Sequence, residues 1–236
     1  GCLDQAAGAI GVGNIRPGLF SENIGAALAV CVPTKELTYD PARQMPVHYF
    51  ALPDTYMMHT FTTGGMCLRW FRDGFCRMEL DVAQMIGDDA YDVMSKEVAL
   101  VPAGSEGLLC LPHLQGSMAP DVNLNAKGVF YGMTLAHKKS HFIRSIMESI
   151  GYIITRNLEA IDDMGLPVDE IRSMGGGSKS DLWNQIKADI TGKRLTLCQS
   201  TQDAACLGAA ILAGAACGIF SSVEEACERM VRVKRV

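Results

Sequence analysis

The sequence predicts a layered α/β fold in which a mixed β-sheet is flanked by helices. Strand-like and helix-like segments alternate through the second half of the chain, and the first half is rich in strand-like segments. Apolar residues make up 48% of the 236 residues and charged residues 20%, a balance typical of a folded chain with a sizeable core. Since no internal repeat and no linker is visible, we expect residues 1–236 to form a single domain.

The first half is expected to turn often, because glycine recurs throughout the first 25 residues. Segments with strand-like composition lie over 23–32, 47–52 and 108–111. Short helical segments are expected over 66–73 and 88–99. The pair Gly64 and Gly65 precedes the first of these helices, and Pro102 follows the second.

The second half contains the clearest helix, over 134–164, where apolar residues recur at spacings of three to five and form one stripe. Gly165 and Pro167 are expected to end it. Further strands are expected over 171–174 and 195–198, and further helices over 179–190 and 204–217. We expect Asp203 to cap the last of these helices, and Ser222, with Glu225 three residues later, to begin a final one.

Charge and cysteine usage exclude several functions. Lys and Arg number 21 against 26 Asp and Glu, and no basic stripe is present, so we expect no nucleic-acid partner. The longest uncharged run, 204–220, is shorter than a membrane span and predicts a buried helix, so no membrane partner is expected either. The nine cysteines form no C-x-x-C pair, which favours reduced, buried thiols in a cytoplasmic protein and no zinc site.

Three glycine-containing turns are the most informative motifs. Gly175–Gly177 joins a predicted strand to a helix start, where bare backbone and free amides suit a phosphate group. The segment is not a Walker A loop, because Ser178 precedes Lys179 where that motif has glycine. A tight strand–helix turn explains this segment equally well. Similar turns at Gly65 and Gly25 favour a phosphate-rich ligand such as a nucleotide.

Asp4 is the notable acidic residue. Its neighbours are small or apolar, which predicts a buried carboxyl group suited to a general base. A carboxylate that binds turn amides is the alternative, and it is favoured about two to one on the residues alone. His137 and His141 lie four residues apart on a predicted helix, but no third ligand is apparent, so a structural or surface role is expected.

A longer pattern over 128–148 resembles the signature of the FGGY carbohydrate kinases. Its positions are Gly128, Phe130, Gly132, Met133, His141, Phe142, Ser145, Ile146, Met147 and Glu148. The segments around Asp4, around Gly176 and over 203–213 are similar to that family's catalytic, adenosine and Ala/Gly-helix segments. The resemblance covers the whole chain but only the family's C-terminal domain, and the sequence looks most like bacterial xylulokinase-like members. It implies a ribonuclease-H-like fold of the actin-like ATPase superfamily.

The resemblance also implies roles for particular residues. Asp4 would be the general base and Gln5 would contact the sugar, while Mg²⁺ would be held through the ATP phosphates, near Asp4. ATP-binding positions would be Gly25, Ala26, Gly65, Arg69, Gly175, Gly176, Gly177 and Ser180. The substrates would be ATP and a sugar, with a pentulose such as xylulose expected.

The chain begins at Gly1 without Met, and we expect it to be a piece of a longer protein. By resemblance, an N-terminal domain would supply the other phosphate loop and much of the sugar pocket, so the isolated domain is expected to be inactive. A homodimer is compatible with the family. One departure supports an alternative: Ala26 stands where the family has a hydroxyl-bearing Thr, which favours a weak or degenerate kinase-like protein that binds nucleotide or sugar. A chaperone-type or actin-type ATPase fits less well, because of the signature.

Overall fold

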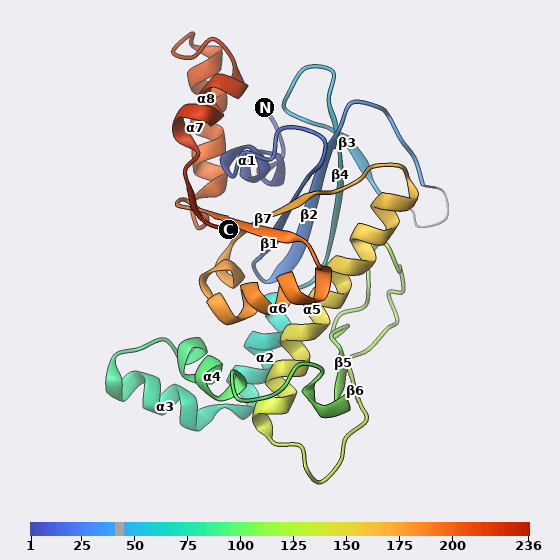
Figure 1. Ribbon diagram of the computed structural model, residues 1–236, viewed down its shortest axis with the longest axis vertical. Helices are drawn as coiled ribbons and strands as arrows, with labels where there is room; N and C mark the ends of the chain where they lie inside the picture. The colour runs from blue at the N-terminus through green and yellow to red at the C-terminus, as the bar shows by residue number, and fades with distance from the viewer. Residues whose placement is uncertain (41–44) are drawn as a thin grey trace.

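The computed structural model describes residues 1–40 and 45–236, and its centre is a seven-stranded mixed sheet (Figure 1). The strand order is β3-β4-β2-β1-β7-β8-β9. Parallel pairing joins β1 to β7 and β7 to β8, and the other neighbours are antiparallel. The strands are β1 (Leu19–Ile24), β2 (Ala27–Thr34), β3 (Val47–Tyr49), β4 (Tyr56–Thr63), β7 (Glu170–Met174), β8 (Arg194–Cys198) and β9 (Val233–Arg235). The predicted α/β class with a mixed sheet is confirmed.

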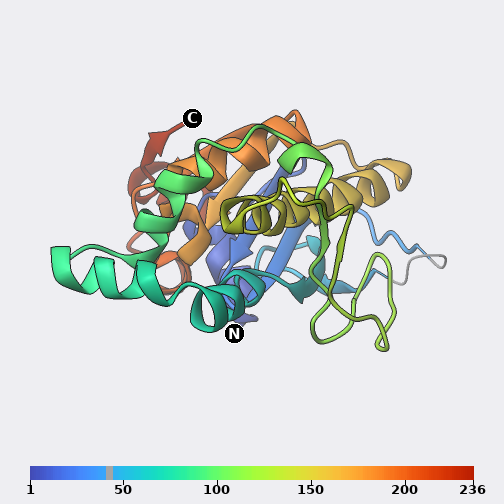
Figure 2. The same ribbon diagram turned by 90° about the horizontal axis from the view of Figure 1, so that it is seen from below.

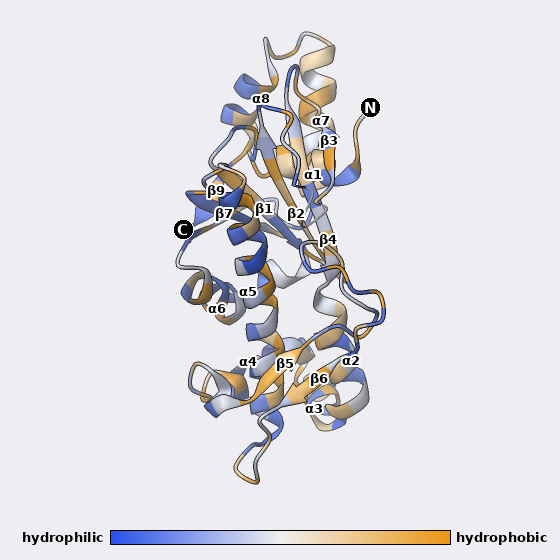
Figure 3. Ribbon diagram, turned by 90° about the vertical axis from the view of Figure 1, so that its right-hand side faces the viewer, coloured by the Kyte–Doolittle hydropathy of each residue, from blue (hydrophilic) through white to orange (hydrophobic). Residues whose placement is uncertain are grey.

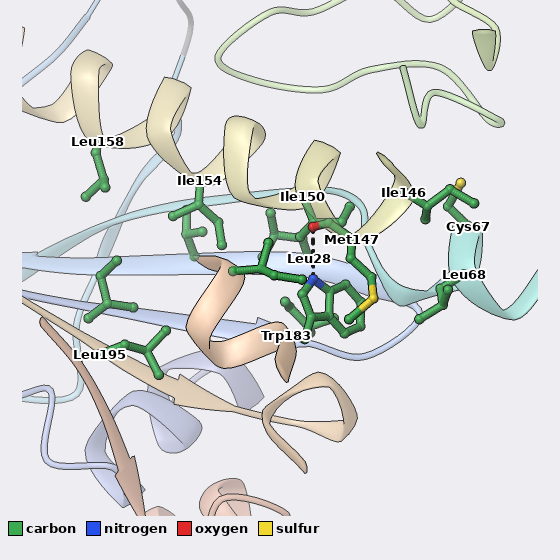
Figure 4. Close-up of a cluster of buried hydrophobic side chains, with 14 of the residues drawn as sticks. Leu28, Cys67, Leu68, Ile146, Met147, Ile150, Ile154, Leu158, Trp183 and Leu195 are labelled. Carbon is green, nitrogen blue, oxygen red and sulfur yellow. Dashed lines mark hydrogen bonds between the residues drawn. The ribbon is translucent and has the colours of Figure 1, made fainter. Parts of the chain in front are cut away.

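Helices cover both faces of this sheet. On one face lie α1 (Asp4–Gly11), α7 (Ala204–Ala216) and α8 (Val223–Met230), and on the other lie α5 (Lys139–Asp163) and α6 (Asp181–Thr191). Successive strand residues alternate between the two cores: Cys31 packs with α1 and α7, whereas Val32 packs with α5. Figure 4 shows the second core, where α5 side chains such as Ile150 and Ile154 meet Leu28 and Trp183.

A smaller layer packs around the N-terminal part of α5 (Figures 1 and 3). It contains α2 (Gly65–Phe75), α3 (Arg77–Ile86), α4 (Ala90–Val98) and the antiparallel pair β5 (Leu109–Leu111) and β6 (Val129–Tyr131). In the view from below, these helices lie in front of the sheet (Figure 2). Short 3₁₀ turns occur at η1 (Ser105–Gly107) and η2 (Gly176–Lys179).

Residues of the 128–148 signature hold this layer to α5. The ring of Phe130 on β6 meets that of Phe142 on α5 at 5.0 Å between centroids. Glu148 is buried and accepts hydrogen bonds from Gly104 N at 2.9 Å, Ser105 Oγ at 2.9 Å and Arg144 Nε at 2.7 Å. The signature is therefore mainly a packing pattern, and within 128–148 only Ile143 and Met147 line the cavity described below.

Several local predictions are wrong. The expected strand over 23–32 is two strands, because the chain turns at Gly25 and Ala26. The long helix begins at Lys139 instead of 134, and the side chain of Asp203 makes no capping hydrogen bond. Ser222 does cap α8, accepting from Glu225 N at 3.1 Å. The helix α1 lies within the stretch expected to be β-rich, and α3, β4, β6 and β9 were not expected.

Two glycines bring α1 and α7 into backbone contact. A Cβ atom on Gly11 would lie 1.8 Å from the carbonyl oxygen of Ala204, and one on Gly208 would lie 1.8 Å from that of Ala7. Such a close approach tolerates no side chain at either position. Within the described residues, no helix is long and apolar enough to cross a membrane.

We predict that Gly208→Ala lowers the free energy of unfolding by roughly 3 kcal/mol, because the new methyl group forces α1 away from α7. Urea unfolding followed by circular dichroism measures this. Gly74→Ala is the control: a Cβ atom there has no neighbour within 4 Å, so alanine should stabilise the helix by about 0.5 kcal/mol. Equal effects of the two substitutions would contradict the packing argument.

Candidate functional site

The three glycine turns meet at one cavity of about 300 Å³ at the carboxyl ends of β1 and β7. Among the residues expected to bind ATP, those that line it are Gly25, Ala26, Gly65, Arg69, Gly176, Gly177 and Ser180. Gly175 does not line it, but it directly precedes two residues that do. Segments separated by about 150 positions in the chain thus converge on one space.

Main-chain hydrogen bonds join the turn at Gly25 to the turn at Gly65. Gly65 N donates to Gly25 O at 3.0 Å, and Ala26 O accepts from Gly64 N at 3.2 Å and from Met66 N at 2.9 Å. The amides at the start of α2 are therefore occupied by the β1–β2 turn. The expectation that the turn at Gly65 offers free amides to a phosphate group is therefore wrong for the amides of Gly64, Gly65 and Met66.

The glycines at and next to the cavity fall into two groups. A Cβ atom on Gly65 would lie 2.5 Å from Gly25 O, and one on Gly177 would lie 2.7 Å from the side chain of Ile24. Gly175 has a φ of +81°, and a Cβ atom there would lie 2.2 Å from the Asn23 side chain. Packing explains these three glycines.

Gly25 and Gly176 belong to the other group. The nearest atoms to a Cβ on these residues would be at 4.0 and 3.8 Å, and neither residue has a positive φ. Packing therefore does not require glycine at either position. Both residues line the cavity, and the absence of a side chain leaves room for a ligand beside their backbone.

The cavity combines an apolar part with charged groups. Met147 and Trp183 belong to the apolar part, and Trp183 is fixed by a hydrogen bond from Nε1 to Met147 O at 3.0 Å (Figure 4). Arg69 and Lys179 supply positive charge. A flat apolar slot beside cationic groups can hold an aromatic base next to phosphates.

Residues of α4 form a wall that the sequence did not indicate: Asp89, Tyr91, Asp92, Met94 and Ser95. Asp89 also caps this helix, accepting from Tyr91 N at 2.9 Å. The Arg72 guanidinium lies 4.7 Å from the centre of the Tyr91 ring, and burial raises the pKa of that phenol. No local signal marks these residues, because tertiary packing alone brings α4 to the cavity.

Ser180 has an evident structural role. Its Oγ accepts a hydrogen bond from Trp183 N at 3.2 Å and caps α6. This bond fixes the first turn of α6, and Asn184 Nδ2 joins that helix to the Gly176 turn by donating to Ser178 O at 2.8 Å.

Asp4 lies outside the cavity. It is the first residue of α1, it is exposed, and it lines a wider groove of about 750 Å³ beside α7. The predicted burial of this carboxylate is therefore wrong. Its neighbour Gln5 connects the two sites, because Gln5 Oε1 accepts from Asn23 Nδ2 at 3.3 Å and Asn23 lies two residues before Gly25.

Histidines and cysteines form no metal site in the described part of the chain, where no group of three or more potential ligands gathers. His137 accepts from Thr134 N and His141 from Lys138 N, as expected for structural histidines. All nine cysteines are free thiols and six are buried, but Cys2, Cys206 and Cys217 are exposed, contrary to expectation.

Residues 30–217 match the FGGY family of carbohydrate kinases, C-terminal domain. The chain belongs to this family. It is 34% identical over 228 residues to a gluconokinase of Bacillus subtilis, covering 95% of the chain and 44% of that protein. It is 31% identical to a xylulose kinase of the same species, covering 98% of the chain and 44% of the relative. The chain thus spans less than half the length of these relatives.

Solved structures support the same assignment. The crystal structure of xylulose kinase from Rhodospirillum rubrum is similar over 100% of this chain and 46% of its own, with a TM-score of 0.82 and 26% identity. Together with the mixed sheet, this confirms the fold expected for an FGGY member, a ribonuclease-H-like domain of the actin-like superfamily.

We predict that Gly177→Ala lowers the free energy of unfolding by about 2 kcal/mol, because its methyl group would overlap Ile24. Gly176→Ala is the matched control, and it should change stability by less than about 0.5 kcal/mol. Thermal unfolding of both variants provides the comparison. A Gly176→Ala loss as large as that of Gly177→Ala would show that packing, not ligand room, requires this glycine.

Proposed function

We propose that the chain is the C-terminal, nucleotide-binding half of a two-domain kinase that transfers the γ-phosphoryl group of ATP to a hydroxyl group of a sugar. The convergence of the turns at Gly25, Gly65 and Gly176 on one cavity carries the proposal. Membership of the FGGY family supports the kinase activity.

In this proposal the base of ATP lies in the apolar part of the cavity, beside Trp183 and the turn of Gly175, Gly176 and Gly177. Arg69 and Lys179 attract the phosphates, and the open backbone at Gly25 and Ala26 receives the terminal ones. Mg²⁺ would be held through the phosphates of ATP, near Asp4, and would lower the charge that the protein must stabilise.

Asp4 is proposed as the general base on the other side of the sheet edge. Its carboxylate takes the proton of the attacking sugar hydroxyl while that oxygen bonds to the γ-phosphorus and the bond from this phosphorus to the bridging oxygen breaks, releasing ADP. Gln5, held by Asn23, contacts the sugar and keeps it close to the phosphate turn. Positioning of the two substrates carries most of the acceleration.

The remaining half of the kinase is proposed to cover the groove that contains Asp4. That groove is lined by small side chains of α1 and α7, among them Ala7, Ala205 and Ala209, and it is open to solvent. Relatives of more than twice this length are consistent with a second domain. Closure of the second domain over the groove would exclude water from Asp4. Without that domain, the present chain should be inactive.

For the sugar we propose a pentulose such as xylulose, as named for the Bacillus and Rhodospirillum kinases. Gluconate is the second candidate, because the gluconokinase relative is 34% identical. An ADP-release assay of the full-length protein with ketoses, polyols and sugar acids decides between them. Turnover with none of these would contradict the proposed function.

We predict that Asp4→Asn in the full-length protein lowers kcat by about 10² to 10⁴, because the general base is lost, while the KM for ATP stays unchanged. Steady-state kinetics with the preferred sugar measures this. Asp162→Asn removes the same charge at an exposed position that lines neither space, and it should leave kcat unchanged. Near-normal turnover of Asp4→Asn would remove this residue from the mechanism.

Ala26→Thr tests the alternative of a degenerate kinase-like protein. Ala26 is exposed at the cavity and lacks the hydroxyl group that the family pattern supplies. If the protein is an ordinary kinase, this substitution should change kcat by less than about threefold, since other donors serve the phosphate. A gain of a hundredfold or more would favour the degenerate alternative.

A further inference from the structure

A fully buried polar trio joins the sheet to α6 beneath the cavity. It consists of Glu22 on β1, Ser173 on β7 and Lys187 on α6, and all three are 0% exposed. Lys187 Nζ pairs with Glu22 Oε1 and also donates to Ser173 Oγ at 2.9 Å. Ser173 Oγ in turn donates to Glu22 Oε1, so each member contacts the other two.

Stability alone does not account for this trio. A buried ion pair loses its hydration, and apolar residues of similar volume often give equal or greater stability. The neighbours in the same row of the sheet are in fact apolar: Val30 lies opposite Glu22, and Leu197 lies opposite Ser173. Burial raises the pKa of Glu22, with Lys187 opposing the rise, and the second carboxylate oxygen of Glu22 has no hydrogen-bond partner.

The position of the trio relates it to the cavity. Glu22 lies three residues before Gly25, and Ser173 lies three residues before Gly176, so both are about 10 Å from these turns along their strands. Lys187 lies two helical turns after Ser180, the residue that caps α6 at the cavity. The trio therefore connects β1, β7 and α6, the elements that adjoin the cavity at the Gly25 turn, at the Gly176 turn and at Trp183.

We infer that Glu22, Ser173 and Lys187 are positioning residues for the nucleotide, an inference that rests on the proposed function. Hydrogen bonds hold their partners within a narrow range of distance and direction. The trio thus sets the distance between α6 and the two turns, and hence the width of the cavity. A displacement of about 1 Å at a substrate site costs up to about a hundredfold in activity.

The test is a double variant of the full-length protein, Glu22→Gln with Lys187→Met, which removes both charges while nearly preserving volume. We expect a melting temperature close to that of the wild type, a KM for ATP raised on the order of tenfold, and a KM for the sugar unchanged. Ser173→Ala leaves the ion pair in place and should raise the KM for ATP by less. A KM for ATP at the wild-type value in both folded variants would overturn the inference.

A matched control uses another buried polar contact on the same face of the sheet. Thr60 Oγ1 donates to Asn157 Oδ1 at 2.8 Å, joining β4 to α5 away from the residues that line the cavity. Thr60→Val with Asn157→Leu should leave the KM for ATP unchanged, and an equal rise in this control would also overturn the inference. Wild-type protein that binds no ATP would instead contradict the proposed function itself.

Discussion

The contact between the β1–β2 turn and the start of α2 is the constraint on which the rest of the site depends. A side chain at Gly64 or Gly65 would overlap the main chain of residues 25–28, and three amides of this segment bond to the carbonyl groups of Gly25 and Ala26. The two turns therefore form one backbone surface. The turn after β7 packs against it, because Gly177 lies next to the side chain of Ile24. Because the contacts between the β1–β2 turn and the start of α2 are between main-chain atoms, the relative position of these two turns owes little to flexible side chains.

The sheet separates the cavity from Asp4. The cavity lies on the side of α5 and α6, whereas Asp4 begins α1 on the opposite side, and the hydrogen bond between Gln5 and Asn23 connects the sides at the end of β1. In the proposed reaction, the phosphoryl group would pass this end of β1 to reach the sugar hydroxyl beside Asp4. The proposed second domain would cover Asp4, so the exposure of this carboxylate in the present half is compatible with its proposed role as general base.

The sequence predicted the second half of the fold well, because α5 has a clear apolar stripe and its end is marked by Gly165. It also placed the glycine turns at one site. It did not reveal α1, whose small residues pack on α7 through Gly11 and Gly208 and lack an apolar stripe. Nor did it reveal the α4 wall or the exposure of Asp4, since both depend on contacts between distant segments. Pairwise tertiary contacts leave no local pattern for sequence analysis to detect.

We propose that the turns at Gly25, Gly65 and Gly176 form the surface that holds a nucleoside triphosphate. Hydrogen exchange of the full-length protein, with and without a non-hydrolysable ATP analogue and Mg²⁺, tests it most directly. We expect slower exchange in the peptides that contain residues 25–28, 65–69 and 176–180, with little change in α8. Saturating analogue that leaves these three segments unprotected, or that protects a different face of the sheet, would contradict it.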